Sequence, residues 1–156
     1  MQIIKIYTDG SSLGNPGNGG YGVTIIENQK VIKELGGFEE QTTNNRMELQ
    51  AVIAALEFCN KNDNKNYEFV ICTDSNYVLS GATIWIHGWE KNGWRTANKK
   101  EVLNQDLWKI LISNLRKCKS KVTFQKVKGH SGEEFNERAD FIATSFSSTQ
   151  KCENMK

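Results

Sequence analysis

Residues 7–11 read YTDGS and residues 72–76 read CTDSN, and each stretch ends a short apolar run. If these runs are neighbouring parallel strands, Asp9 and Asp74 emerge at the same edge of one sheet, where open α/β sheets hold their ligands. Carboxylates gathered at such an edge repel one another unless a divalent cation neutralises their charge. The two stretches therefore predict a metal-dependent enzyme.

Strands and helices are predicted on either side of these two stretches. Apolar and β-branched runs predict strands over residues 3–8, 21–27, 31–38, 67–73 and 122–127, with a turn-rich loop over residues 10–20. Helical spacing predicts helices over residues 45–59, 75–88, 100–117 and 135–146. In the third of these helices we expect the inward residues to be Leu103, Leu107, Ile110, Leu111 and Leu115.

The order of the elements predicts the architecture. Short connections between the first three strands favour antiparallel hairpins, whereas the last two strands are reached through helices, which implies parallel pairing. We therefore expect an α/β fold with a five-stranded mixed sheet, three antiparallel strands then two parallel, flanked by helices.

Length and composition fit one domain. The chain has 156 residues, of which 1–146 are expected to form the domain and 147–156 a polar, flexible C-terminal tail. No apolar stretch approaches the roughly 20 residues of a membrane span. Because the N-terminus enters a strand without the layout of a signal peptide, we expect a cytoplasmic protein with no membrane partner, and a monomer by default.

Charge is unevenly distributed along the chain. Residues 91–128 contain eleven Lys or Arg against two acidic residues, a net of +9, so the rest of the chain carries −7 to give the overall +2. A basic segment on an otherwise acidic protein is typical of a nucleic-acid partner. A solvated helix face with a polar loop is the alternative that charge alone favours.

Four acidic residues, Asp9, Glu48, Asp74 and Asp140, are the candidate ligands, and each has a local alternative. Asp9 could cap the turn that follows it, but its repeated Thr-Asp context favours a functional role. Asp74 precedes Ser75 and a predicted helix, so it could cap that helix. Glu48 fits a capping box that begins at Asn45. Asp140 could interact with the dipole of the last helix. The prediction therefore depends on the order and surroundings of all four residues.

That combination resembles a known family. The stretches YTDGS (7–11), TTNNRME (42–48), TDSNYV (73–78), VKGHSG (127–132) and NERAD (136–140) resemble bacterial type 1 ribonuclease H in order and spacing over residues 3–146. The resemblance implies the ribonuclease H-like fold. It also implies cleavage of the RNA strand of RNA/DNA hybrids.

The resemblance also implies a catalytic set. Asp9, Glu48, Asp74 and Asp140 would bind two Mg²⁺ ions, with Mn²⁺ as a possible substitute, and the products would carry 5′-phosphate and 3′-hydroxyl ends. His130 matches the family histidine in a Gly-flanked loop, which is thought to assist proton transfer or product departure.

Further matched positions are expected to contact the hybrid. Residues that match the minor-groove side are Gly10, Ser11, Asn15, Thr43, Asn44, Asn45 and Asn76, the last replacing the Gln of some members. Residues 85–100 resemble the basic protrusion on the DNA strand, with candidate contacts Lys91, Trp94, Arg95, Lys99 and Lys100. Trp89 and Trp94 are expected to anchor this protrusion rather than to stack on bases, because a duplex offers no unstacked bases.

Glu90 and Asn92 make the segment less basic than in some relatives, which predicts weaker hybrid binding and a shallower salt dependence.

Rival interpretations are another enzyme of the same fold, such as a retroviral-type ribonuclease H, an integrase-like transferase or a junction resolvase, and a non-catalytic module that binds hybrids. Motif spacing favours the stand-alone bacterial kind over the other enzymes. The four carboxylates favour an enzyme over the binding module, because a mere binder gains nothing from anionic groups facing phosphate.

Overall fold

The computed structural model of the protein describes residues 2–128 and 134–154. Within these residues the strands form one sheet in the order β3-β2-β1-β4-β5. β1 pairs antiparallel with β2 and parallel with β4, and β4 pairs parallel with β5. The strand bounds are β1 (Gln2–Ser12), β2 (Gly17–Glu27), β3 (Lys30–Thr42), β4 (Tyr67–Thr73) and β5 (Lys121–Lys126). The predicted mixed sheet is therefore confirmed.

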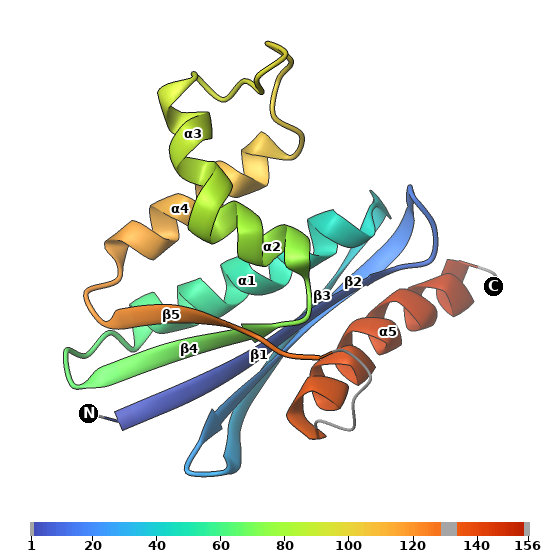
Figure 1. The fold of residues 1–156 in the computed structure, drawn as a ribbon. Coiled ribbons are helices and arrows are strands. Elements are labelled where there is room, and N and C mark those ends of the chain that lie inside the picture. The colour runs from blue at the N-terminus through green and yellow to red at the C-terminus, as the bar shows by residue number, and fades with distance from the viewer. Residues whose placement is uncertain (1, 129–133, 155–156) are drawn as a thin grey trace.

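Helices lie on both faces of this sheet (Figure 1). Their bounds are α1 (Asn44–Lys61), α2 (Asn76–Ser80), the π-helix η1 (Gly81–Trp85), α3 (Ile86–Lys91), α4 (Gln105–Lys117) and α5 (Glu134–Asn154). Figure 1 shows α1 and α4 on one side of the sheet and α5 on the other. Among the described residues, no helix combines the length and apolar character needed to span a bilayer.

Strand alternation gives each face its own core. Ile4 and Ile6 of β1 belong to the large buried cluster shared with α1 and α4, whereas Tyr7 belongs to a smaller cluster with Ala139 of α5. Successive side chains of a strand point to opposite faces, so one strand supplies both cores. β1 is thus covered on both faces, which fixes its position between α1 and α5.

The β2–β3 hairpin turns at Asn28 and Gln29, whose φ angles are 53° and 68°. Two consecutive residues with positive φ form the tight hairpin turn that matches the twist of its flanking strands. The predicted hairpin is therefore confirmed. The strand bounds were less well predicted, since β3 continues to Thr42.

The loop predicted over residues 10–20 is mostly strand. β1 continues to Ser12 and β2 begins at Gly17, so Asp9 lies inside β1, paired with Gly22, rather than beyond its end. Gly20, in this stretch, and Gly22, just beyond it, are needed for packing against α5. A Cβ on Gly20 or Gly22 would lie closer than 3.0 Å to backbone atoms of α5.

Helix α4 begins at Gln105, not at residue 100 as predicted. Asn104 has a left-handed backbone with a φ of 62°, which separates the helix from the segment before it. Leu103 therefore precedes the helix and is 76% exposed, and Ile110 is 47% exposed. The prediction that both face the core is wrong, and Trp108 is buried in their place.

Helix α5 continues to Asn154, beyond its predicted end at Phe146. Ser147 is buried, and its hydroxyl donates a hydrogen bond to the Thr144 carbonyl. Ser147 thus packs with the domain instead of starting the polar tail. The flexibility expected for the remaining residues of that tail stays a prediction.

Candidate functional site

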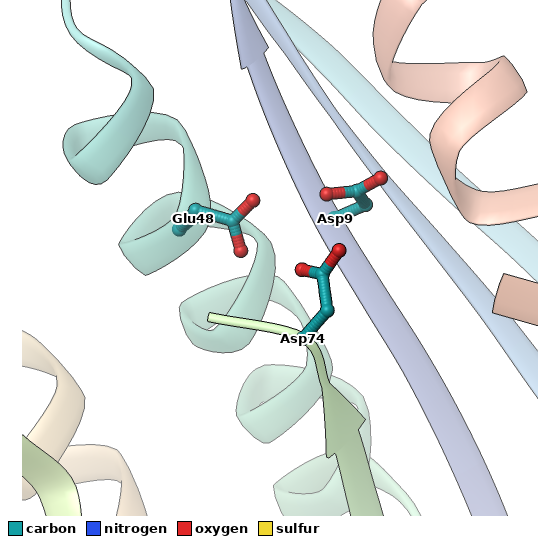
Figure 2. A group of neighbouring side chains, drawn as sticks. All are labelled: Asp9, Glu48 and Asp74. Atoms are coloured by element: carbon teal, nitrogen blue, oxygen red, sulfur yellow. The ribbon is translucent and has the colours of Figure 1, made fainter. Parts of the chain in front are cut away.

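Three carboxylates from separate elements meet at one edge of the sheet. Asp9 comes from the middle of β1, Glu48 from the second turn of α1, and Asp74 from the residue after β4. One oxygen from each lies within 4.8 Å of the others. Figure 2 shows the three side chains pointing toward one another. The sheet edge predicted from the two Thr-Asp stretches therefore does bring distant acids together.

Gly10 allows Glu48 to reach Asp9. A Cβ on Gly10 would lie closer than 3.0 Å to the backbone of Met47 and Glu48, so only glycine lets α1 approach β1 this closely. The Gly10 amide donates hydrogen bonds to Asp9 Oδ1 at 2.9 Å and to Glu48 Oε1 at 2.8 Å. One backbone N–H thus holds two carboxylates side by side.

The capping alternatives for Asp74 and Glu48 are excluded by the helix starts. Thr43 is the N-cap of α1, and its hydroxyl accepts a hydrogen bond from the Arg46 amide. Ser75 caps α2 in the same way through the Val78 amide. The carboxylates of Asp74 and Glu48 are therefore not used as helix caps and are available to the acidic group with Asp9.

Asp140, in the second turn of α5, borders the same pocket but is not one of the three residues in the tight group. Its charge is one of the smaller contributions to the raised pKa of Asp9. The cavity has a volume of about 350 Å³ and is lined by Asp9, Gly10, Ser11, Asn44, Glu48, Asp74, Ser75 and Asp140. All four predicted carboxylates therefore face one cavity.

The electrostatics of the cluster disfavour its full ionisation. Burial raises the pKa of Asp9 to about 7, and the charges of Asp74 and Asp140 act in the same direction, while contact with the Glu48 carboxyl group opposes the rise. Burial and then the charge of Asp9 raise the pKa of Glu48 well above its usual range. Such a cluster favours binding of a cation that can neutralise it.

One carboxylate oxygen of Glu48 lacks a hydrogen-bond donor among the described residues. Oε1 accepts the Gly10 hydrogen bond, but Oε2 is buried and no hydrogen-bond donor reaches it from the described part of the chain. A buried charged oxygen without a donor is costly unless a cation binds it. Hard oxygen ligands at this spacing suit Mg²⁺ or Mn²⁺, so the residues present fit the predicted metal.

The predicted hybrid-contact residues divide into groups by position. Gly10, Ser11 and Asn44 line the pocket. Asn15 lies beside it, because its Oδ1 accepts a hydrogen bond from the Asn44 amide at 3.2 Å. The remaining three, at the starts of α1 and α2, lie outside the pocket lining: Thr43, Asn45 and Asn76.

Of the predicted basic protrusion, residues 85–91 belong to η1 and α3, and the rest lies in the segment that leads from α3 toward α4 (Figure 1). Trp94 is half-buried, and its ring lies 6.1 Å from that of Trp89; both pack against the main core. This packing agrees with the anchoring interpretation of the two Trp residues, and a contact of Trp94 with the hybrid stays a prediction. The other predicted contacts of this segment are exposed: Lys91, Arg95, Lys99 and Lys100.

His130 lies outside the described residues, so its predicted role is unaffected by the structure. Two residues near the acids were missed by the sequence analysis. Ser75 lines the pocket, and the Lys126 ammonium group donates a hydrogen bond to the Asp74 carbonyl. The parallel pairing of β4 and β5 explains Lys126, since its register partner Thr73 immediately precedes Asp74.

The sheet order, the covering helices and the acidic pocket define an α/β protein of the ribonuclease H-like fold. The sequence model of the RNase H family matches residues 1–148. A ribonuclease H of Cyanothece sp. is 48% identical over 152 residues, covering 97% of this chain and 94% of that protein. The chain belongs to the RNase H family.

Another bacterial ribonuclease H and a solved RNase H1 structure are also similar to this chain. A ribonuclease HI of Neisseria meningitidis serogroup B is 49% identical over 142 residues, covering 91% of this chain and 93% of that protein. The crystal structure of LC9-RNase H1, described as a type 1 RNase H with the type 2 active-site motif, has a TM-score of 0.83 and 28% identity. It covers 96% of this chain and 74% of that one.

The fold is also shared by LC11-RNase H1, which was solved in complex with an RNA/DNA hybrid. The two structures have a TM-score of 0.71 and 23% identity, with 94% of this chain and 98% of that one covered.

Proposed function

We propose that this protein is an endonuclease that hydrolyses the RNA strand of RNA/DNA hybrids. The observation that carries the proposal is the convergence of Asp9, Glu48 and Asp74 within 4.8 Å, with Asp140 on the same cavity. Membership of the RNase H family supports the reaction, and LC11-RNase H1 illustrates that a protein of this fold can bind the hybrid.

Asp9, Glu48, Asp74 and Asp140 are the residues that would hold the divalent cations. Two bound Mg²⁺ ions would supply charge neutralisation at the scissile phosphate, activation of a water molecule and stabilisation of the departing 3′ oxygen, giving 5′-phosphate and 3′-hydroxyl products. The protein's own contribution is placement. The Gly10 amide orients Asp9 and Glu48 before any substrate arrives.

Substrate selection is assigned to the rim of the pocket. Ser11 and Asn44 lie where a 2′-hydroxyl could both donate to and accept from the protein, and Asn15 holds the Asn44 backbone in place. Asn76 begins α2 and is exposed, so a contact with the minor groove is open to its amide. The exposed cations of the protrusion would bind the phosphates of the DNA strand.

His130 is proposed to assist proton transfer or product departure. Its ordinary pKa near 6.5 suits a shuttle at neutral pH. Because the carboxylates and their cations carry the main charge stabilisation, His130→Ala is expected to slow turnover rather than abolish it. The monomeric state and cytoplasmic location expected from the sequence remain predictions.

The experiment is cleavage of an end-labelled RNA/DNA hybrid with Mg²⁺ and with EDTA. Duplex DNA and duplex RNA are the substrate controls, and Asp9→Asn is the protein control. We expect only the hybrid's RNA strand to be cut, only with metal, and not by Asp9→Asn. New 5′ ends should accept a kinase-transferred label only after phosphatase treatment. Hybrid binding without cutting in any divalent metal would instead identify a binding module.

A further inference from the structure

Asp9 and Asp140 come from opposite ends of the chain, and Gly22 lies between the elements that carry them. In the β1–β2 ladder Gly22 is the direct partner of Asp9. Residues directly opposite in an antiparallel pair point to the same face of the sheet. Gly22 therefore occupies the face of the sheet on which α5 packs, next to the Asp9 side chain.

Helix α5 crosses the sheet directly over this glycine. A Cβ on Gly22 would lie closer than 3.0 Å to the Ala139 carbonyl oxygen, and at 3.0 Å from the Ala143 amide. Ala139 is fully buried and immediately precedes Asp140. The missing side chain at Gly22 thus sets how closely this turn of α5, and with it Asp140, approaches Asp9.

A second contact holds the same turn from the outside. Arg138 Nε and the Glu34 carboxylate are 2.6 Å apart, with a further bond from Nη2 at 3.0 Å, joining α5 to the edge strand β3. The bidentate geometry restrains orientation as well as distance. The close contact at Gly22 and the Arg138–Glu34 ion pair therefore both restrain the helical turn that carries Asp140.

This restraint on α5 affects the acidic pocket, because Asp140 is part of its lining. Glu48 Oε2 is buried without a hydrogen-bond donor among the described residues, which indicates that the cluster is built for a cation. An Asp side chain is short, so its carboxylate cannot compensate for a displaced helix. Misplacing a functional group by about 1 Å can cost on the order of a hundredfold.

We infer that Gly22 and the Arg138–Glu34 pair are positioning residues that set Asp140 against Asp9 and thereby complete the cation site. The inference rests on the metal site of the proposed function. The residues act through the placement of α5; neither touches the substrate or the cation.

The test compares Gly22→Ala with Gly36→Ala, measuring Mn²⁺ binding by calorimetry. Gly36 is the partner of Gly22 in β3, but its Cβ would meet the side-chain ends of Phe146 and Ile142, which can move without displacing the α5 backbone. Both variants should lower the melting temperature. Only Gly22→Ala should raise the Kd for Mn²⁺, by about 10-fold or more.

An Asp140→Asn background separates positioning from general damage. There, Gly22→Ala should cause no further loss of Mn²⁺ affinity, because the group that it misplaces has already been removed. A further loss as large as in the wild-type background would overturn the inference, as would a folded Gly22→Ala protein that binds Mn²⁺ like Gly36→Ala.

Arg138→Gln covers the case in which Gly22→Ala does not fold. Arg116→Gln is its matched control, because Arg116 forms a similar pair with Glu90 on α3, remote from α5. Exposed pairs contribute about 1 kcal/mol or less, so both variants should fold. We expect only Arg138→Gln to weaken Mn²⁺ binding, at least about twofold; equal affinities would overturn the inference. Absence of Mn²⁺ binding by the wild-type protein would overturn the proposed function itself.

Discussion

At the scale of single residues, Gly10 determines how closely Glu48 can approach Asp9. Gly10→Ala should destabilise the protein by about 3 kcal/mol or more, because the added methyl group would collide with the backbone of α1 rather than with a movable side chain. Urea denaturation measures the change.

Gly88→Ala is the control for this substitution. Gly88 lies in α3, and a Cβ there would meet nothing within 4 Å, so alanine should stabilise the helix by about 0.5–1 kcal/mol. Equal changes in stability for Gly10→Ala and Gly88→Ala would show that close packing against α1 is not the reason why position 10 requires glycine.

Asp9→Asn should stabilise the metal-free protein near and above neutral pH. Asp9 has a pKa of about 7 in the fold against 3.8 as its ordinary value, so its contribution to stability is complete below pH 3.8 and is lost as the pH rises through about 7. In EDTA the wild-type melting temperature should fall between about pH 4 and about pH 7, and that of Asp9→Asn should fall less. The gain at about pH 8 should be roughly 2 kcal/mol.

Parallel falls in the two melting temperatures would contradict close packing of the acids.

The close packing of the acids could be predicted from sequence for Asp9 and Asp74, because both follow apolar strand patterns that a parallel sheet brings together. The role of Gly22 could not. It stands in the predicted strand over residues 21–27, and only the strand register and the packing of α5 reveal that it faces a helix beside Asp9.

At the scale of elements, Asp63 ties the end of α1 to the start of β5. Its carboxylate accepts hydrogen bonds from the backbone amides of Lys119 and Ser120, both at 2.8 Å, and from the Ser120 hydroxyl. These bonds, first that from the Ser120 side chain, lower the pKa of Asp63 to about 2. The connection is made between two loops that are distant in sequence.

Asp63→Asn should therefore remove an acid-sensitive contribution to stability. Because the folded pKa is depressed, the contribution is present above about pH 3.8 and is lost as the pH falls through about 2. Melting temperatures should be lower for the variant at neutral pH and should converge with the wild type near pH 2. A constant difference across that range would show that Asp63 acts through packing rather than charge.

The helices show where sequence periodicity fails. For α1, predicted over residues 45–59, the structure gives Asn44–Lys61 with its N-cap at Thr43, so this helix was predicted well. For α4, the spacing of Leu103 and Leu107 suggested one continuous apolar face, but the left-handed Asn104 interrupts it. Asn104 also donates to the Tyr77 hydroxyl, a tertiary contact with α2 that no local pattern could indicate.

At the scale of the whole molecule, the protein separates an acidic pocket from a basic protrusion. Not every Arg is available to a polyanion. Arg116 pairs with Glu90 at 2.5 Å, and Arg46 pairs with Asp106 at 2.8 Å. The pairing of Glu90 supports the prediction that this segment binds phosphate less strongly than a segment without that acid would.

Glu90→Gln should release Arg116 for phosphate. Hybrid binding should tighten at low salt, and the slope of log Kobs against log salt should become steeper by up to about 0.9, the value for one added phosphate contact on duplex DNA. Fluorescence anisotropy in EDTA, at several salt concentrations, measures the slope without cleavage. An unchanged slope would place Arg116 outside the contact surface.

The order of the elements along the chain has a consequence for biosynthesis. β1, α1 and β4 supply three of the four acids, whereas the fourth is on α5, which leaves the ribosome after every strand of the sheet. A chain whose translation stops before residue 134 would contain the sheet and three of its carboxylates but not Asp140. The acidic pocket is therefore completed late, when α5 packs against the glycines of β2.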